Sequence, residues 1–192
     1  QVKAAAQNDG ADSLARLLAL ASTERHRDLV SKASSTVSSW LMLCERPAIS
    51  CGGGKDSTAT ALLVLSQAPS TPIYCADPPN PLPDRSEYLD QLQRWLGREF
   101  IRVPYDWDVE AVLLGNMAYP DGLKIRLLRE RMTDHDGVAL GMRARESHAR
   151  SVLAAVRGEM YRLKSGEWRC LPILRWTAED VLAYLVSTGC PI

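Results

Sequence analysis

Apolar positions recur at helical spacing through the first quarter of the chain. Leucines fall on one helical face between residues 14 and 20, and a second helix is predicted to run through Trp40. The stretch Ser22–Arg25 (STER) has the residue types that cap the start of a helix. Residues 1–10 are small and polar and predict a frayed lead-in. We therefore predict an N-terminal helical extension over residues 1–46.

From residue 47 onward, short apolar runs alternate with helical patterns. The alternation is typical of an α/β fold, with a Rossmann-like, open, mainly parallel twisted sheet flanked by helices. We assign residues 47–192 to one such domain. Four strands are predicted over 47–50, 71–76, 98–104 and 137–142. Helices are predicted over about 56–67, 84–96, 108–116, 123–131, 145–157 and 177–189, with a hairpin that turns at Ser165-Gly166.

Composition narrows the class of protein further. With 192 residues, of which 46% are hydrophobic and 24% charged, the chain is typical of a folded globular domain. Its 23 basic and 23 acidic residues cancel, so charge indicates neither nucleic acid nor an anionic membrane as a partner. No apolar stretch approaches the roughly 20 residues of a membrane helix. Five cysteines without a CxxC pair predict reduced thiols, no zinc or iron–sulfur site, and a cytoplasmic location.

A glycine-rich loop joins the first predicted strand to the next helix, in the sequence CGGGKDST (51–58). Glycines let the backbone turn tightly, so that amide N–H groups at a helix N-terminus can face an anion such as phosphate or sulfate. Lys55 adds a positive charge, and Ser57 and Thr58 add hydroxyl donors. The simpler interpretation is a turn of purely geometric origin. The combination of glycines, lysine and hydroxyls favours an anion site.

Two common phosphate motifs do not match this loop. A Walker A loop requires GxxxxGK[ST], but Ile49 stands at the first glycine and Asp56 follows the lysine. The dinucleotide motif GxGxxG fails because Ser57 stands at its last glycine.

Four motifs resemble a different phosphate-binding family. The loop resembles the SGGKDS pyrophosphate loop of the adenine nucleotide alpha hydrolases, the PP-loop superfamily. Three further segments resemble its phosphoadenosine phosphosulfate (PAPS) reductase-like branch in particular. They are DPPNPLPD (77–84), which is similar to DTGxxFPE; GMRARES (141–147) followed by Arg150, which is similar to GxRxxESxxR; and LPILRWTAEDVLAYL (171–185).

The resemblance implies roles for individual residues. Lys55, Asp56 and Arg143 would be catalytic, and Asp56 would contact Mg²⁺ if ATP is the substrate. Simpler interpretations stay open: Asp56 as a helix N-terminal acid, Asp77 as a turn cap, and a Glu146–Arg150 surface pair. Trp176, Asp180 and Tyr184 are expected to dock the last helix. The residues expected to bind the nucleotide are Gly52, Gly53, Gly54, Ser57, Thr58, Asp77, Gly141, Arg145 and Arg150.

Departures from the family pattern leave several functions open. Gly52 replaces the leading serine, and the reductases carry a catalytic cysteine in an ECGxH tail that residues 1–192 lack. A domain truncated at its C-terminus or a different reaction would explain this. The resemblance implies a sulfonucleotide reductase acting on an adenylyl sulfate or an ATP pyrophosphatase, with a thiol reductant or sulfur-carrier protein as partner. The alternatives are a sulfur-transfer protein of DNA phosphorothioation and a non-catalytic nucleotide-binding regulatory module. The acceptor, 3′-phosphate recognition and oligomeric state stay open.

Overall fold

The computed structural model describes residues 2–77, 83–104 and 121–191. The predicted helix at 108–116 and most of the proline-rich loop lie outside these ranges.

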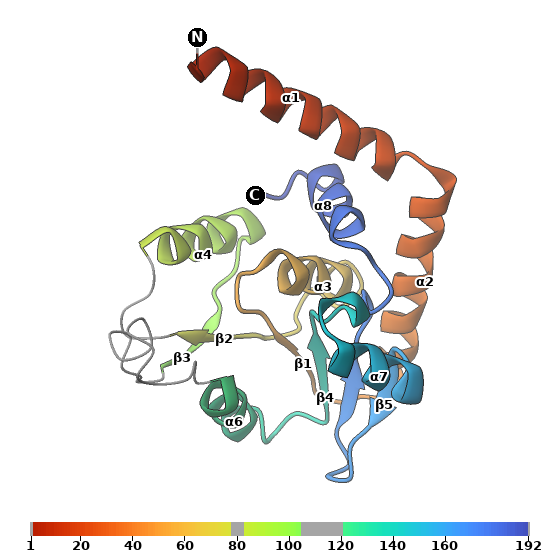
Figure 1. Ribbon diagram of the computed structural model, residues 1–192. Helices are drawn as coiled ribbons and strands as arrows, with labels where there is room; N and C mark the ends of the chain where they lie inside the picture. The colour runs from red at the N-terminus through yellow and green to blue at the C-terminus, as the bar shows by residue number, and fades with distance from the viewer. Residues whose placement is uncertain (1, 78–82, 105–120, 192) are drawn as a thin grey trace.

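The described strands form one six-stranded sheet in the order β3-β2-β1-β4-β6-β5 (Figure 1). All neighbours pair in parallel except β5 and β6, which form the predicted antiparallel hairpin. This confirms the Rossmann-like α/β class. The strands are β1 (Pro47–Ser50), β2 (Ile73–Asp77), β3 (Ile101–Pro104), β4 (Gly137–Leu140), β5 (Met160–Arg162) and β6 (Trp168–Cys170).

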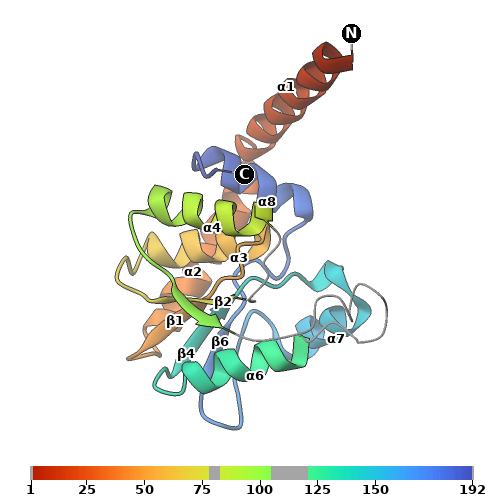
Figure 2. The ribbon, with the colours of Figure 1, turned by 90° about the vertical axis from the view of Figure 1, so that its left-hand side faces the viewer.

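Helices cover both faces of the sheet because strand side chains alternate in direction. Ile49 and Ala139 join the core beneath α2, α3, α4 and α8, whereas Ala48 and Val138 join a second core beneath α6. A third cluster packs beneath α7. Figures 1 and 2 show these layers on either side of the strands. The helices are α1 (Val2–Ala21), α2 (Glu24–Leu41), α3 (Lys55–Leu65), α4 (Pro83–Leu96), α6 (Asp121–Arg131), the short 3₁₀ helix η1 (Ala144–Glu146), α7 (His148–Arg157) and α8 (Ala178–Ser187).

Most boundaries lie within a few residues of the predicted ones, and two helical segments differ more clearly. Residues 2–10 are helical, within α1, instead of frayed. Three consecutive alanines in this stretch favour a helix more than its polar residues oppose one. The helix predicted over 145–157 is split, because Ser147 has an extended backbone and its side chain accepts the N–H of Arg150 as the N-cap of α7.

A buried carboxylate ties the N-terminal helices to the last helix. Asp180 in α8 receives hydrogen bonds from Arg25 of α2 at 2.7 and 3.2 Å and caps its own helix through Thr177. Burial alone would raise the pKa of Asp180, but hydrogen bonds from Arg25 and Thr177 lower it to about 2. Trp176 and Tyr184 pack edge to face beside it, with ring centroids 5.4 Å apart. The predicted docking role of these residues is therefore confirmed.

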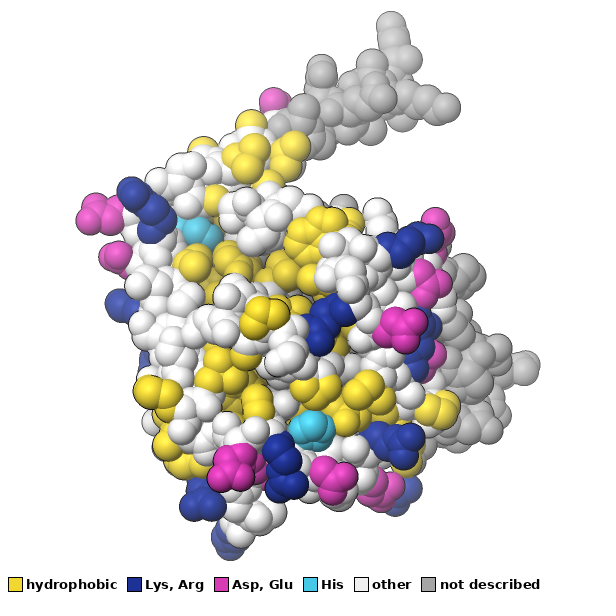
Figure 3. Space-filling model, turned by 180° about the vertical axis from the view of Figure 1, so that it is seen from behind, with side chains coloured by type: hydrophobic (Ala, Val, Ile, Leu, Met, Phe, Trp, Pro, Cys, Tyr) yellow, Lys and Arg dark blue, Asp and Glu magenta, His cyan; other side chains and the backbone are white. Residues whose placement is uncertain are grey.

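Charges of both signs are interspersed on the surface. Viewed from behind, acidic and basic side chains alternate around the margin of the molecule while apolar side chains gather toward the middle (Figure 3). Among the described residues, no helix is both long and apolar enough to cross a membrane.

Asp180 makes folding sensitive to acid. Because its pKa in the folded protein lies below the ordinary value of 3.8, its stabilising effect is complete above that value and is lost as pH falls toward 2. We expect Asp180→Asn to remove about 2 kcal/mol of pH-dependent unfolding free energy across this window. Urea unfolding at a series of pH values measures it. Glu179→Gln, at an exposed neighbour, should keep the wild-type pH slope, and an unchanged slope in Asp180→Asn would contradict the assignment.

Candidate functional site

The glycine loop lies between the end of β1 and the start of α3. Gly53 has a φ of 79°, which side-chain-bearing residues rarely adopt, and a Cβ there would lie 2.7 Å from Cδ2 of Leu89 in α4. Gly54 is the N-cap of α3 and has an extended backbone, and a Cβ added to it would meet no other atom within 4 Å. The loop is therefore held tightly at Gly53 and is open at Gly54.

The end of β4 lies directly against the first turn of α3. A Cβ at Gly141 would lie 2.4 Å from both the backbone N and the Cα of Ser57. Only a residue without a side chain allows this contact. The sequence predicted Gly141 as a ligand-binding residue, and the structure gives it a packing role that brings two distant segments together. A glycine directly after a strand was the available signal.

Arg143 reaches from this turn to the start of α3. Its Nε lies 2.8 Å from Oδ1 of Asp56, and Nζ of Lys55 lies 3.3 Å from Oδ2 of the same carboxylate. The Arg143 side chain is only 10% exposed. The three residues predicted to be catalytic therefore meet at one helix N-terminus, with Asp56 between two cations.

Glu146 fixes Arg143 from the other side. Its carboxylate accepts the backbone N–H of Arg143 at 2.9 Å and pairs with the side chain of Arg150. Burial would raise the pKa of Glu146, but the hydrogen bonds from Arg143 and Arg150 lower it. The surface pair considered from the sequence is therefore present, and it also orients Arg143. Arg145 is exposed on η1 and its predicted contact stays a prediction.

The two hydroxyl residues of the loop have different positions. Ser57 lies at the helix start, and its Oγ donates to the carbonyl of Gly54 at 2.9 Å. Thr58 is fully buried, and its backbone N–H already donates to the Gly54 carbonyl at 3.0 Å. The predicted ligand contact of Ser57 stays a prediction, and Thr58 lies in the packed interior.

Asp77 stands at the end of β2, next to β1 in the sheet. Its Oδ2 lies 3.5 Å from a guanidinium nitrogen of Arg102, which also pairs with Asp90. The loop over 78–82 that would follow it lies outside the described residues. Because β2, β1 and β4 are neighbours, their carboxyl ends meet at one edge of the sheet, where ligands of such sheets bind.

The residues present do not fit a protein-held Mg²⁺. Both carboxylate oxygens of Asp56 already contact cations, and no group of three His, Cys, Asp or Glu side chains suited to a metal occurs in the described ranges.

Cys190 is not a ready source of a thiolate. Burial, followed by the nearby Cys51, raises its pKa to about 11.

The family model of the phosphoadenosine phosphosulfate reductase domain matches residues 46–192. The chain belongs to this family. A search of curated protein sequences finds no significant match.

Solved structures share the fold of this PAPS reductase family member at low identity. FMN adenylyltransferase from Candida glabrata matches with a TM-score of 0.62 and 14% identity, over 94% of this chain and 63% of that one. PAPS reductase from Candida auris matches with a TM-score of 0.62 and 13% identity, over 88% of each chain. A U34-tRNA thiolase from Methanococcus maripaludis matches with a TM-score of 0.55 and 15% identity, over 85% of this chain and 65% of that one. The chain thus spans less than two thirds of the adenylyltransferase.

The contact at Gly141 predicts a large effect of one added methyl group. We expect Gly141→Ala to destabilise the fold by about 1–3 kcal/mol, because a Cβ would overlap the backbone of α3. Gly54→Ala, in open space beside the same turn, serves as the matched control and should cost about 1 kcal/mol or less as a weaker N-cap. Chemical unfolding measures both, and equal effects of the two substitutions would contradict the close approach.

Proposed function

We propose that this domain binds an adenine nucleotide with its phosphates at residues 52–57 and acts next to the α-phosphate. The observation that carries the proposal is the position of Arg143, which is held beside the N-terminus of α3 together with Lys55. Membership of the PAPS reductase family supports it.

The site offers three kinds of positive potential to a phosphate chain. The first N–H groups of α3 lack partners within the helix, and its dipole adds favourable potential for an anion. Lys55 contributes a compact charge, and Arg143 contributes a planar guanidinium that matches phosphate oxygens. Such preorganised groups are suited to stabilise charge that develops during phosphoryl chemistry.

Asp56 acts as a positioning residue in this proposal. Its carboxylate holds Arg143 and Lys55 at one point before any nucleotide binds. A bound phosphate competes with Asp56 for both cations, and Glu146 keeps Arg143 in place through the exchange. Mg²⁺ would then arrive on the nucleotide, since it is usually held by substrate phosphates with only one or two carboxylates.

The favoured reaction is cleavage of ATP at its α-phosphate. A nucleophilic oxygen of an acceptor attacks the α-phosphorus, the bond from that phosphorus to the bridging oxygen breaks, and pyrophosphate leaves. Lys55 and Arg143 would neutralise the charge that builds up on the leaving group. The high pKa of Cys190 supports this chemistry over attack by that cysteine on a sulfonucleotide.

Sulfonucleotide reduction is the second candidate, favoured by the family that the chain belongs to. A thiolate supplied by a reductant protein would attack the sulfur of an adenylyl sulfate. The sulfur–oxygen bond to the nucleotide breaks, and a second thiol would release sulfite and form a disulfide. We propose a cytoplasmic setting for either reaction, because both need reduced thiols or an intracellular nucleotide supply.

Product analysis separates these functions. We expect ATP with Mg²⁺ to give pyrophosphate, and Lys55→Ala to lower the rate by about a hundredfold or more. The matched control Lys32→Ala removes an exposed lysine of α2 and should keep wild-type activity. Sulfite from an adenylyl sulfate plus a dithiol would favour the second candidate, and tight binding without product would favour a regulatory module. No calorimetric binding of any of these nucleotides would refute the proposal.

Replacement of Asp56 tests its positioning role. Asp56→Asn removes the anion that competes with phosphate but leaves Arg143 less well oriented. We therefore expect tighter nucleotide binding together with a turnover that is about tenfold to a hundredfold lower. The Mg²⁺ concentration for half-maximal activity should not change. A large rise in that Mg²⁺ requirement would instead make Asp56 a metal ligand.

A further inference from the structure

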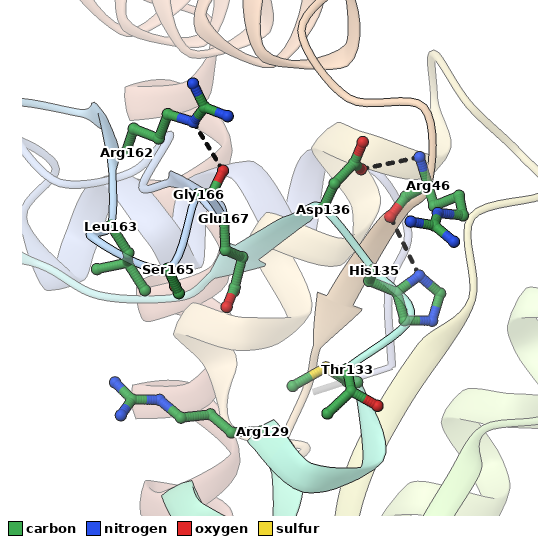
Figure 4. A pocket seen from close by; sticks show the side chains of 11 residues that line it. Arg46, Arg129, Thr133, His135, Asp136, Arg162, Leu163, Ser165, Gly166 and Glu167 are labelled. Atoms are coloured by element: carbon green, nitrogen blue, oxygen red, sulfur yellow. Dashed lines mark hydrogen bonds between the residues drawn. The ribbon is translucent and has the colours of Figure 1, made fainter.

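A pocket separate from the glycine loop lies at the amino ends of the strands, whereas the glycine loop lies at their carboxyl ends. Arg46, Asp136 and Glu167 directly precede β1, β4 and β6, three neighbouring strands, and all three residues line the pocket. The end of α6 and the β5–β6 turn complete its walls, as Figure 4 shows. Its volume is about 580 Å³, within the range of small-molecule sites.

Hydrogen bonds hold the frame of this pocket in place. The carboxylate of Asp136 accepts the backbone N–H groups of Glu45 and Arg46, both at 2.9 Å. Nδ1 of His135 lies 3.1 Å from the carbonyl oxygen of Arg46, and the carbonyl of Asp136 accepts the N–H of Trp168 at 2.8 Å. Three strand starts are therefore tied together, and the pocket is preformed.

Arginines from three separate segments line this frame. Arg46, Arg129 and Arg162 are all exposed, and among the residues that the structure describes none of them pairs with a carboxylate. Arg162 donates through Nε to the carbonyl of Gly166 at 2.8 Å, which leaves its terminal nitrogens available.

The two acids of the pocket do not balance these charges. Glu167 lies 2.8 Å from Arg169, whose side chain is 6% exposed, and Asp136 accepts backbone amides and interacts electrostatically with Arg46, which leaves Arg129 and Arg162 without a carboxylate of their own in the pocket lining. Burial lowers the pKa of Arg169 and the nearby Arg129 lowers it further, against the opposing effect of Glu167. Three arginines and two carboxylates therefore line the pocket, Arg169 adds a further positive charge behind Glu167, and the excess positive charge favours an anion.

We propose that this pocket binds the phosphate group of a small phosphorylated molecule. Guanidinium groups bind phosphate oxygens in pairs of parallel hydrogen bonds, and the hydroxyl of Ser165 on the same walls supplies a further donor. The volume exceeds that of a bare ion, which favours a phosphate monoester over inorganic phosphate. The site is separate from the glycine loop, because it lies at the amino ends of the strands.

Shift mapping by NMR on the full chain tests this site. Inorganic phosphate and ribose 5-phosphate would be titrated separately. We expect changes in the amide chemical shifts of Thr133, Ser165 and Gly166 with each compound that binds. Tighter binding of the ester identifies a phosphorylated metabolite, and equal binding identifies free phosphate; both support the site. Arg129→Gln and Arg162→Gln should each weaken binding by about tenfold, the usual effect of one charged hydrogen bond.

Controls distinguish this pocket from the glycine loop. Lys55→Ala should leave the shifts at Ser165 and Gly166 unchanged, and Arg27→Gln removes an exposed arginine outside the pocket as a matched control for charge. Arg129→Lys keeps the positive charge. It should therefore retain part of the affinity for phosphate, even if Arg129→Gln perturbs the fold. Shifts confined to Gly52–Gly54, or no response to either compound, would overturn the proposal. A response to a single-stranded oligonucleotide alone would also overturn it, in favour of a nucleic-acid surface.

Discussion

The contact between Gly141 and the first turn of α3 is the constraint on which the candidate site depends. The backbone at Gly141, directly after β4, lies so close to Ser57 that a Cβ atom would not fit between them. Arg143 follows two residues later and so reaches Asp56 across a short span. If the two backbones stood further apart, the guanidinium could not reach the carboxylate at the N-terminus of α3. The distance between the end of β4 and the start of α3 thus determines how Lys55, Asp56 and Arg143 are arranged.

Local signals in the sequence predicted most of the fold. The helix cap within Ser22–Arg25 and the turn at Ser165-Gly166 act through neighbouring residues, and both lie where the sequence predicts them. Alternating apolar runs predicted the parallel sheet because buried strands and amphipathic helices differ in period. These features depend on a few residues at a time, so a single sequence contains the necessary information.

Long-range contacts account for what the sequence did not predict. Asp56 and Arg143 are 87 positions apart, and no spacing rule shows that they form a pair. The packing role of Gly141 likewise depends on Ser57, which arrives from another segment. The arginines of the pocket at the amino ends of the strands are spread over 46–162, and no local motif connects them. Ser147 resembled a helix residue because the competing cap is visible only in the folded backbone.

The position of Asp56 between two cations has a consequence for selectivity. Any incoming anion must displace an internal carboxylate that Lys55 and Arg143 already neutralise. A ligand with a single negative charge gains little from that exchange, because it replaces one charge with an equal one. A polyphosphate brings several charges and gains in the exchange. If the loop binds a nucleotide as proposed, Asp56 would favour polyphosphate tails over monovalent anions.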